Sequence, residues 1–434
     1  MSEHSWRAGD RSHTAAEHGE RAPLVILANF VSPLAVDLSE RSVLRGWSEQ
    51  AARKLWLTRP GDVLITPAPL SDAFRRYAFE RLGIPDGSVT VVTVPDAPLL
   101  PTAQALAAHG LLEPLRALVR ERPGACLLPT ALDAASVALA GELGVPVVPY
   151  ETSPPPPATV KAVARLNTKS GFRAVAHELG IRLPYGRVCT GAELFRVTDE
   201  VLSVHERVVV KPDRSAGGHG LYFVTRDDRT SQPMPSVDTH WVVEQYVGHT
   251  TAVSAQGYVT AGGADVLYDG EMRMSGGSFV GYRSPLDDLS DLTRAELADW
   301  TRVLGRHLGA EGYRGPYSLD AVRAQDGTLH ALECNVRRTA TTTAHALVTR
   351  LVHGGRPVWS TGVAGASLPS FDSVLARLTG SCLDFRPADG EGVLLYTDRP
   401  VNGSGWRYVA IAADHSRLAS LEGRLAATLK PAVL

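Results

Sequence analysis

Short apolar runs alternate with stretches of helical spacing over residues 22–150. The apolar runs lie at 24–28, 63–66, 89–94, 126–128 and 145–148. The helix-like stretches between them lie near 39–56, 71–82, 102–120 and 131–143. Strands that alternate with helices form a mostly parallel sheet covered by those helices. The pattern therefore predicts a Rossmann-like α/β domain over 22–150.

The segments that border this domain differ from it in composition. Residues 1–21 are charged and small, without periodicity, and are predicted to be disordered. Four prolines at 154–157 are stiff and extended, and they mark the domain's end. The first turn, at 29–33, has no GxGxxG sequence, so we expect a scaffold and substrate wall there rather than a dinucleotide site.

Two runs of alternating apolar and polar residues flank Asp326-Gly327, a dipeptide typical of two-residue hairpin turns. A type I′ turn there needs φ above zero at both central residues and places Gln325 opposite Thr328. Counting outward from that pair places Asp320 opposite Glu333. The sequence thus predicts two carboxylates that face each other on one hairpin.

The same register places Ser318 opposite Asn335, on the face that carries Glu333. Like charges directly opposite each other destabilise a sheet, so the arrangement makes sense with a cation between Asp320 and Glu333. A ligand set made of oxygen atoms suits Mg²⁺ or Mn²⁺. The alternative is a solvated hairpin whose acids have no function.

Lysine is rare in this chain, which makes each lysine informative. Five of the 44 basic residues are lysines and the other 39 are arginines. Lysine is a compact point charge suited to phosphate. Lys211 ends the apolar run 208–210, and the glycine-rich stretch 213–220 lies between it and a second apolar run. We interpret this as a phosphate-binding hairpin lid, and not as a P-loop, because GxxxxGK[ST] is absent.

Lys169 lies near a predicted helix start that Thr168 or Ser170 could cap. Its alternative interpretation is an ordinary solvated lysine. Glu244 follows another apolar run, where it faces a base or a ribose, or is simply an exposed strand end.

Three arginines are candidates for binding anionic substrates. Arg337 and Arg338 follow Asn335 at once, so a basic pair lies beside the predicted metal site. Arg283 lies in the predicted strands of 254–283, beyond a glycine pair at 276–277.

Composition excludes several classes of function. Among 434 residues, 44% are hydrophobic, 21% are charged and the net charge is −2, so we expect neither nucleic acid nor a membrane surface as a partner. No apolar run is long enough for a membrane span, and the N-terminus lacks the apolar segment of a signal peptide. The four cysteines are scattered, which predicts a reducing, cytoplasmic location.

Taken in order, these motifs resemble the ATP-grasp superfamily. They are Asn-x-Lys before a helix, Val-Val-Lys-Pro with a glycine-rich lid, Val-Glu-Gln-Tyr-Val, and an aspartate followed by Glu-x-Asn-x-Arg. The resemblance implies a pre-ATP-grasp domain at 22–150 and an ATP-grasp fold at 158–250, including the lid, and 251–365, with metal-binding and catalytic residues. A small C-terminal α/β piece at 366–434 is expected on the substrate side.

The resemblance also implies a role for each candidate residue. Phosphates of ATP would be held by Lys169 and Lys211, and the γ-phosphate would be covered by Ser215, Gly217, Gly218, His219 and Gly220. Adenine would be bound by Glu244, Gln245, Tyr246 and Val247, and one or two Mg²⁺ ions by Asp320, Glu333 and Asn335. Arg337 would stabilise the transferring phosphoryl group, with Arg283 or Arg338 as partners of the substrate carboxylate.

Two departures from the family pattern leave roles open. Many members have an acid for the ribose hydroxyls a few residues after the hinge glutamate, where this chain has His249, Thr250 and Thr251. Many have an arginine two residues before the metal aspartate, where this chain has Ser318. Neither the ribose contact nor the catalytic arginine is therefore assigned.

Within the superfamily, the chain resembles the pheganomycin-type peptide ligases, on its Ala-Asn-Phe-Val-Ser-Pro, Gly-Pro-Tyr-Ser-Leu-Asp and Glu-Cys-Asn-Val-Arg-Arg blocks and the tail after 366. The resemblance implies a ligase in natural-product biosynthesis that joins a small carboxylate to the N-terminal amine of a peptide, through an acyl phosphate, with release of ADP and phosphate. A ligase of two free amino acids and a non-catalytic nucleotide sensor are the alternatives. A homodimer is one assembly that the sequence leaves open.

Overall fold

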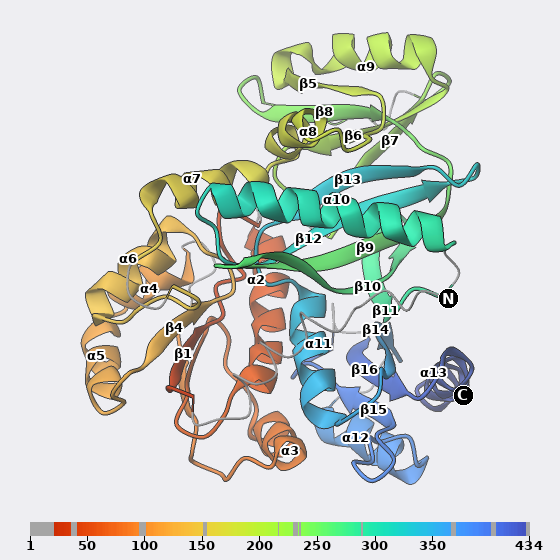
Figure 1. Ribbon diagram of the computed structural model, residues 1–434. Helices are drawn as coiled ribbons and strands as arrows, with labels where there is room; N and C mark the ends of the chain where they lie inside the picture. Colours follow the sequence, from red (N-terminus) through yellow and green to blue (C-terminus); the bar gives the residue numbers. More distant parts are fainter. Residues whose placement is uncertain are drawn as a thin grey trace.

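The computed structural model describes residues 21–35, 41–94, 101–150, 154–215, 217–228, 233, 236–287, 290–365, 370–400 and 405–430. Nearly all of the tail predicted to be disordered lies outside these residues. The described chain contains three sheets, and Figure 1 shows how they are arranged. None of the described helices combines the length and the apolar character that crossing a membrane requires.

The N-terminal domain is a parallel sheet with helices around it, as the periodicity predicts. Its strand order is β3-β2-β1-β4, and all neighbouring strands are parallel. The strands are β1 (Leu24–Leu27), β2 (Val63–Thr66), β3 (Thr90–Thr93) and β4 (Cys126–Pro129). The helices are α2 (Arg41–Glu49), η1 (Gln50–Leu57), α3 (Asp72–Leu82), α4 (Thr102–Ala108), α5 (Leu112–Arg120) and α6 (Ala134–Leu143).

Two details of this domain differ from the prediction. The run at 145–148 forms only one parallel bridge, from Val147 to Leu127, because Pro146 and Pro149 lack the N–H donors of a continuous strand. The stretch 102–120 is two helices, since Gly110 has a φ of +67° and ends the first of them.

A small antiparallel sheet forms the second layer, at the top of Figure 1. Its order is β5-β8-β6-β7, with β5 (Gly186–Thr190), β6 (Arg207–Pro212), β7 (Tyr222–Thr225) and β8 (His240–Gln245). Helix α9 (Leu194–Val204), which follows the short η2 (Gly191–Glu193), packs its apolar side chains on the valines of β6 and β8. Helices α7 (Pro157–Leu166) and α8 (Lys169–Glu178) connect this layer to the N-terminal domain.

The third sheet has eight strands in the order β13-β12-β9-β10-β11-β14-β16-β15. They are β9 (His249–Thr260), β10 (Gly263–Ser275), β11 (Ser278–Ser284), β12 (Gly315–Ala324), β13 (Leu329–Asn335), β14 (Val358–Ala364), β15 (Gly392–Leu395) and β16 (Trp406–Ala412). Helix α10 (Asp291–Ala310) packs on β9 and β10 (Figure 1). The remaining helices are α11 (Ala340–Leu351), α12 (Phe371–Gly380) and α13 (His415–Thr428). The strands after residue 366 thus extend the same sheet.

The hairpin of β12 and β13 has the predicted pairing at its functional end, but a different turn. Asp320 pairs with Glu333. The loop is closed by hydrogen bonds from Ala324 N to Thr328 O (2.8 Å) and from Gly327 N to Ala324 O (3.0 Å), so it is one residue longer than predicted. Gly327 has a φ of +88°, whereas no other residue of this turn has a positive φ, so the type I′ prediction is wrong.

A bulge cancels that extra loop residue. Ala321 pairs with Ala331, so Leu332 is the additional residue of β13 before the Asp320–Glu333 pair. The loop shifts the register by one position and the bulge shifts it back. The carboxylates therefore lie opposite each other, as predicted, through two irregularities that the sequence pattern did not reveal.

Candidate active site

A cleft of about 760 Å³ lies between the small sheet and the eight-stranded sheet. Its walls come from β6, the glycine-rich loop, β8, the β12–β13 hairpin and the N-terminal domain. Most of the residues singled out from the sequence line it, namely Lys169, Lys211, Ser215, Gly217, Gly218, His219, Glu244, Gln245, Tyr246, Val247, Asp320, Glu333, Asn335 and Arg337. Segments distant in sequence thus form one site.

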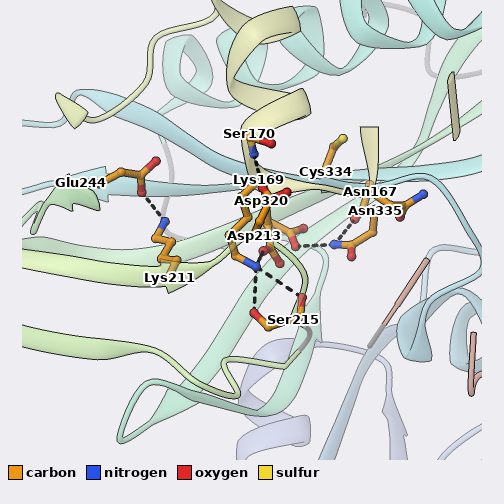
Figure 2. Close-up of polar contacts among 12 residues, drawn as sticks. Asn167, Lys169, Ser170, Lys211, Asp213, Ser215, Glu244, Asp320, Cys334 and Asn335 are labelled. Carbon is orange, nitrogen blue, oxygen red and sulfur yellow. Dashed lines mark hydrogen bonds and ion pairs between the residues drawn. The ribbon is translucent and has the colours of Figure 1, made fainter. Parts of the chain in front are cut away.

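Lys169 is buried at the first position of α8, which Thr168 caps by accepting a hydrogen bond from Gly171 N. Its Nζ donates to Ser215 Oγ (2.8 Å) and lies 3.7 Å from Glu333 Oε2. Burial lowers the pKa of Lys169, and Glu333 acts in the opposite direction. The ammonium therefore lies between the loop after β6 and the hairpin acids (Figure 2).

Lys211, in β6, forms an ion pair with Glu244 of β8. Glu244 is 2% exposed and also pairs with Arg173 of α8. The sequence left Glu244 as a base contact, a ribose contact or an exposed strand end, and burial excludes the exposed end. The Glu244 carboxylate forms ion pairs with both Arg173 and Lys211. It therefore fixes the position of the Lys211 ammonium at the cleft wall (Figure 2).

The residues after Glu244 provide a partly aromatic wall. Gln245, Tyr246 and Val247 line the cleft. The guanidinium of Arg207 lies 4.2 Å from the ring centroid of Tyr246 and 5.0 Å from that of Phe223. Stacked cationic and aromatic planes suit a planar heterocycle.

The glycine-rich loop lies against the turn between β10 and β11. Gly217 and Gly218 have φ values of +65° and +80°. Gly217 O accepts from Phe279 N (3.1 Å), and a Cβ on Gly218 would come within 1.9 Å of Gly277 O. Gly220 does not line the cleft but packs on Pro212 at the end of β6. The loop thus contacts the β10–β11 turn through its backbone, and a side chain at position 218 would prevent this contact.

Asp320 lies in a network of hydrogen bonds, and Glu333 pairs with it across the hairpin. Asp320 is 9% exposed and accepts from Ser254 Oγ (2.6 Å) and from Asn335 Nδ2 (3.0 Å). Burial raises the pKa of Asp320 to about 7, and the charge of Glu333 acts in the same direction. Two carboxyl groups and an amide thus meet at the functional end of the hairpin.

These donors fit a divalent cation of the Mg²⁺ class. All of them offer oxygen, and Mg²⁺ that shares its shell with water and phosphate needs few protein ligands. A cation would offset the raised pKa of Asp320. Within the described ranges, no group of three His, Cys, Asp or Glu side chains forms an alternative metal site.

The three predicted arginines have different environments. Arg337 is buried and donates to Asn167 Oδ1, and burial lowers its pKa while Glu333 and Asp320 act to raise it. Arg283 and Arg338 do not line the cleft. Arg283 faces Glu271 on the neighbouring strand (2.7 Å), and Arg338 borders a separate small cavity at the N-terminal domain. The structure therefore does not bring these two to the site.

Sequence reasoning missed two groups of cleft residues. Ser254 and Gln256 alternate along the otherwise buried β9, and such alternating polar residues in an apolar strand were a usable signal. Phe30, Trp47 and Arg53 come from the N-terminal domain and line the same cleft. The first turn was expected to be a substrate wall, and Phe30 lies in that turn.

Comparisons with known proteins agree with this architecture. The family model of the pre ATP-grasp domain matches residues 51–145, and that of the PGM1 C-terminal domain matches 373–425. A curated relative, the L-propargylglycine–L-glutamate ligase of Streptantibioticus cattleyicolor, is 26% identical over 348 residues, covering 69% of each chain.

Solved structures show the same fold at low identity. N5-carboxyaminoimidazole ribonucleotide synthetase of Thermus thermophilus has a TM-score of 0.57 at 15% identity, covering 95% of this chain and 99% of that one. The L-amino acid ligase of Bacillus licheniformis has a TM-score of 0.54 at 12% identity, covering 94% and 98%. The order of sheets and these likenesses together show that the chain has an ATP-grasp-like α/β fold, preceded by a domain that matches the pre ATP-grasp model.

Proposed function

We propose that this protein is an ATP-dependent carboxylate–amine ligase that forms an amide bond. The observation that carries the proposal is the single cleft in which two buried lysines and a closed glycine loop face Asp320, Glu333 and Asn335. The curated relative, a ligase by name, supports it.

The chemistry follows from the charges in the cleft. A carboxylate is a poor acyl donor, and transfer of the γ-phosphoryl group to it creates an acyl phosphate with phosphate as its leaving group. Lys169 and Lys211 would neutralise phosphate oxygens, and Arg337 would stabilise charge on the transferring group. The loop at Gly217 and Gly218 would exclude water, which otherwise hydrolyses the acyl phosphate. Mg²⁺, held by Asp320, Glu333 and Asn335, would add charge neutralisation when bound.

Two classes of amine acceptor have specific support. The match at 373–425 lies in the tail on which the resemblance to pheganomycin-type peptide ligases partly depends, and it favours a peptide acceptor in natural-product synthesis. The relative named as a ligase of L-propargylglycine and L-glutamate favours a free amino acid.

The first test is product analysis. The protein is incubated with ATP, Mg²⁺ and mixtures of amino acids and short peptides, and products are identified by mass. We expect an amide product with ADP and phosphate, and an ATP-dependent hydroxamate when hydroxylamine replaces the amine. Asp320→Asn and Glu333→Gln should abolish product. Release of pyrophosphate contradicts the mechanism, and ATP binding without turnover under every mixture favours a sensor.

The second test distinguishes the acceptors. kcat/KM is compared for a free amino acid and for peptides of increasing length with the same first residue. A rise over the first residues followed by a plateau indicates a peptide acceptor, because each further ordered residue costs about 1–2 kcal/mol of backbone entropy. Equal or better use of the free amino acid indicates a dipeptide-forming ligase.

A further inference from the structure

The cleft has a second cationic region, contributed by the N-terminal domain and the C-terminal strands. Arg53 of η1 is 1% exposed and borders the cleft. Its Nη2 donates to Gln50 Oε1 (3.1 Å), and its guanidinium lies 4.8 Å from the ring centroid of Phe30. Arg407 of β16 borders the same cleft. The Nε atoms of both arginines are buried and make no hydrogen bond within the described structure.

No described carboxylate forms an ion pair with Arg53, with Arg407 or with the buried neighbour Lys54. Lys54 Nζ donates instead to the hydroxyl of Thr343 (2.9 Å). Burial lowers the pKa of Arg53 to about 10, and Arg407 acts in the same direction. Buried charges are ordinarily paired, so Arg53 and Arg407, two cations that border the cleft without an acid, indicate that the missing anion comes from outside the chain.

The surroundings of the two arginines also suit an anion with a carbon skeleton. Thr339, Ala340 and Thr341, at the N-terminus of α11, line the cleft, and the positive end of a helix dipole favours negative charge. Phe30 and Trp47 pack with ring centroids 5.1 Å apart and border the same space. Charge and apolar surface are thus available side by side.

We propose that Arg53 and Arg407 form a second carboxylate site, which binds a substrate carboxylate that is not activated by ATP. The proposal rests on the proposed ligase function. Asp320 lies on β12, and four strands separate β12 from β16 in the sheet order, so the two sites bind different carboxylates. The ligand class is a carboxylate-bearing substrate, either the α-carboxylate of an amino acid or an acidic group of a peptide.

The test measures binding rather than turnover. The full-length protein, loaded with Mg²⁺ and a non-hydrolysable ATP analogue, is titrated by calorimetry with the proteinogenic amino acids, L-glutamate among them, and with Glu-Gly-Gly. Each probe is paired with its neutral counterparts, such as L-isoglutamine for the α-carboxylate, L-glutamine for the side chain and the tripeptide amide. A carboxamide that binds more weakly than its parent carboxylate identifies which carboxylate the site binds, the α-carboxylate, the side-chain carboxylate or the C-terminal carboxylate of the peptide.

We expect wild type to bind at least one carboxylate probe 10- to 100-fold more tightly than its carboxamide, as charge-assisted hydrogen bonds do. In Arg53→Met and Arg407→Met this preference should fall below about threefold, with the affinity for the nucleotide analogue unchanged. Arg53→Lys keeps the charge without the planar fork and should retain part of the preference. Arg120→Met, at an exposed arginine of the same domain, controls for net charge.

Stability separates binding from a structural role. Removal of an unpaired buried cation should leave the ligand-free thermal midpoint unchanged or raise it. A probe panel in which wild type prefers no carboxylate overturns the proposal. The proposal is also overturned if Arg53→Met and Arg407→Met keep the preference for the carboxylate probe. It is likewise overturned if these variants lose affinity for the carboxylate and for the carboxamide to the same extent. Carboxylate binding without any ligation would instead contradict the proposed function alone.

Discussion

Asp320→Asn should stabilise the protein in the absence of divalent metal while abolishing ligation. The burial of Asp320 opposite Glu333 raises its pKa from 3.8 to about 7. Each pKa unit corresponds to about 1.4 kcal/mol, so ionising Asp320 in the metal-free folded protein costs up to about 4 kcal/mol. The substitution removes that cost.

The sign of the pH dependence follows from the same shift. An acid whose pKa is higher in the folded than in the unfolded protein binds its proton more tightly when folded. Its stabilising contribution is present below about pH 4 and is lost as the pH rises to about 7. Wild-type protein in EDTA should therefore lose stability over this window, and Asp320→Asn should lose less.

The stability that Asp320→Asn gains at pH 8 should be smaller than the upper limit of about 4 kcal/mol. The asparagine carbonyl still accepts from Ser254, but its amide faces the donor group of Asn335, which we expect to cost about 1 kcal/mol. A gain of about 2–3 kcal/mol remains. At about 2.1 cal/mol/K of unfolding entropy per residue, this raises the melting temperature of a 434-residue chain by about 2–3 °C.

The assay is thermal unfolding in EDTA between pH 5 and pH 8, repeated with excess Mg²⁺. Mg²⁺ should raise the melting temperature of wild type more than that of Asp320→Asn. Asp326→Asn is the matched control, because Asp326 lies on the same hairpin and accepts a hydrogen bond from Thr328 N, which lowers its pKa. An Asp320→Asn variant that is less stable than wild type at pH 8 in EDTA, or that turns over at the wild-type rate, would refute the reasoning.

Three further predictions concern the nucleotide end. Lys211→Ala should weaken ATP binding about tenfold or more by calorimetry, because a charge-assisted contact is lost, whereas exposed Lys161→Ala should leave it unchanged; equal affinities would contradict the lid assignment. Arg337→Lys should lower kcat about 100-fold with little change in KM for ATP, if its fork acts on the transferring group; a pure KM effect would contradict that role. Gly218→Ala should raise KM for ATP more than Gly217→Ala does, because only Gly218 has no room for a Cβ beside the β10–β11 turn.

Much of the fold could be predicted because local pattern determines it. The run at 63–66 is a strand with those bounds. A short apolar run between two helical stretches is typical of a strand that is buried on both faces of a parallel sheet. Lys211, Glu244 and the hairpin acids were identified because each ends or faces a recognisable strand. The pairing of Lys211 with Glu244 was not predictable, because it depends on two strands becoming neighbours in an antiparallel sheet.

The substrate end shows why the rest could not be predicted. Arg53 and Arg407 lie in different domains, and only the tertiary packing brings both to one cleft. In a chain with 39 arginines, no local signal separates these two from arginines at the surface. Arg283 and Arg338 illustrate the reverse case, since their sequence neighbours suggested a site that they do not line.

The continuity of the eight-stranded sheet has a practical consequence for protein engineering. Because β16 pairs along its length with β14, the C-terminal segment is a structural member of the sheet that carries the hairpin acids. A truncation after β14 would uncover an edge strand prone to aggregation and would remove Arg407 in the same step. Exchange of substrate specificity between related ligases should therefore be attempted by grafting side chains onto β16, because swapping the tail as a module cuts through a hydrogen-bonded sheet.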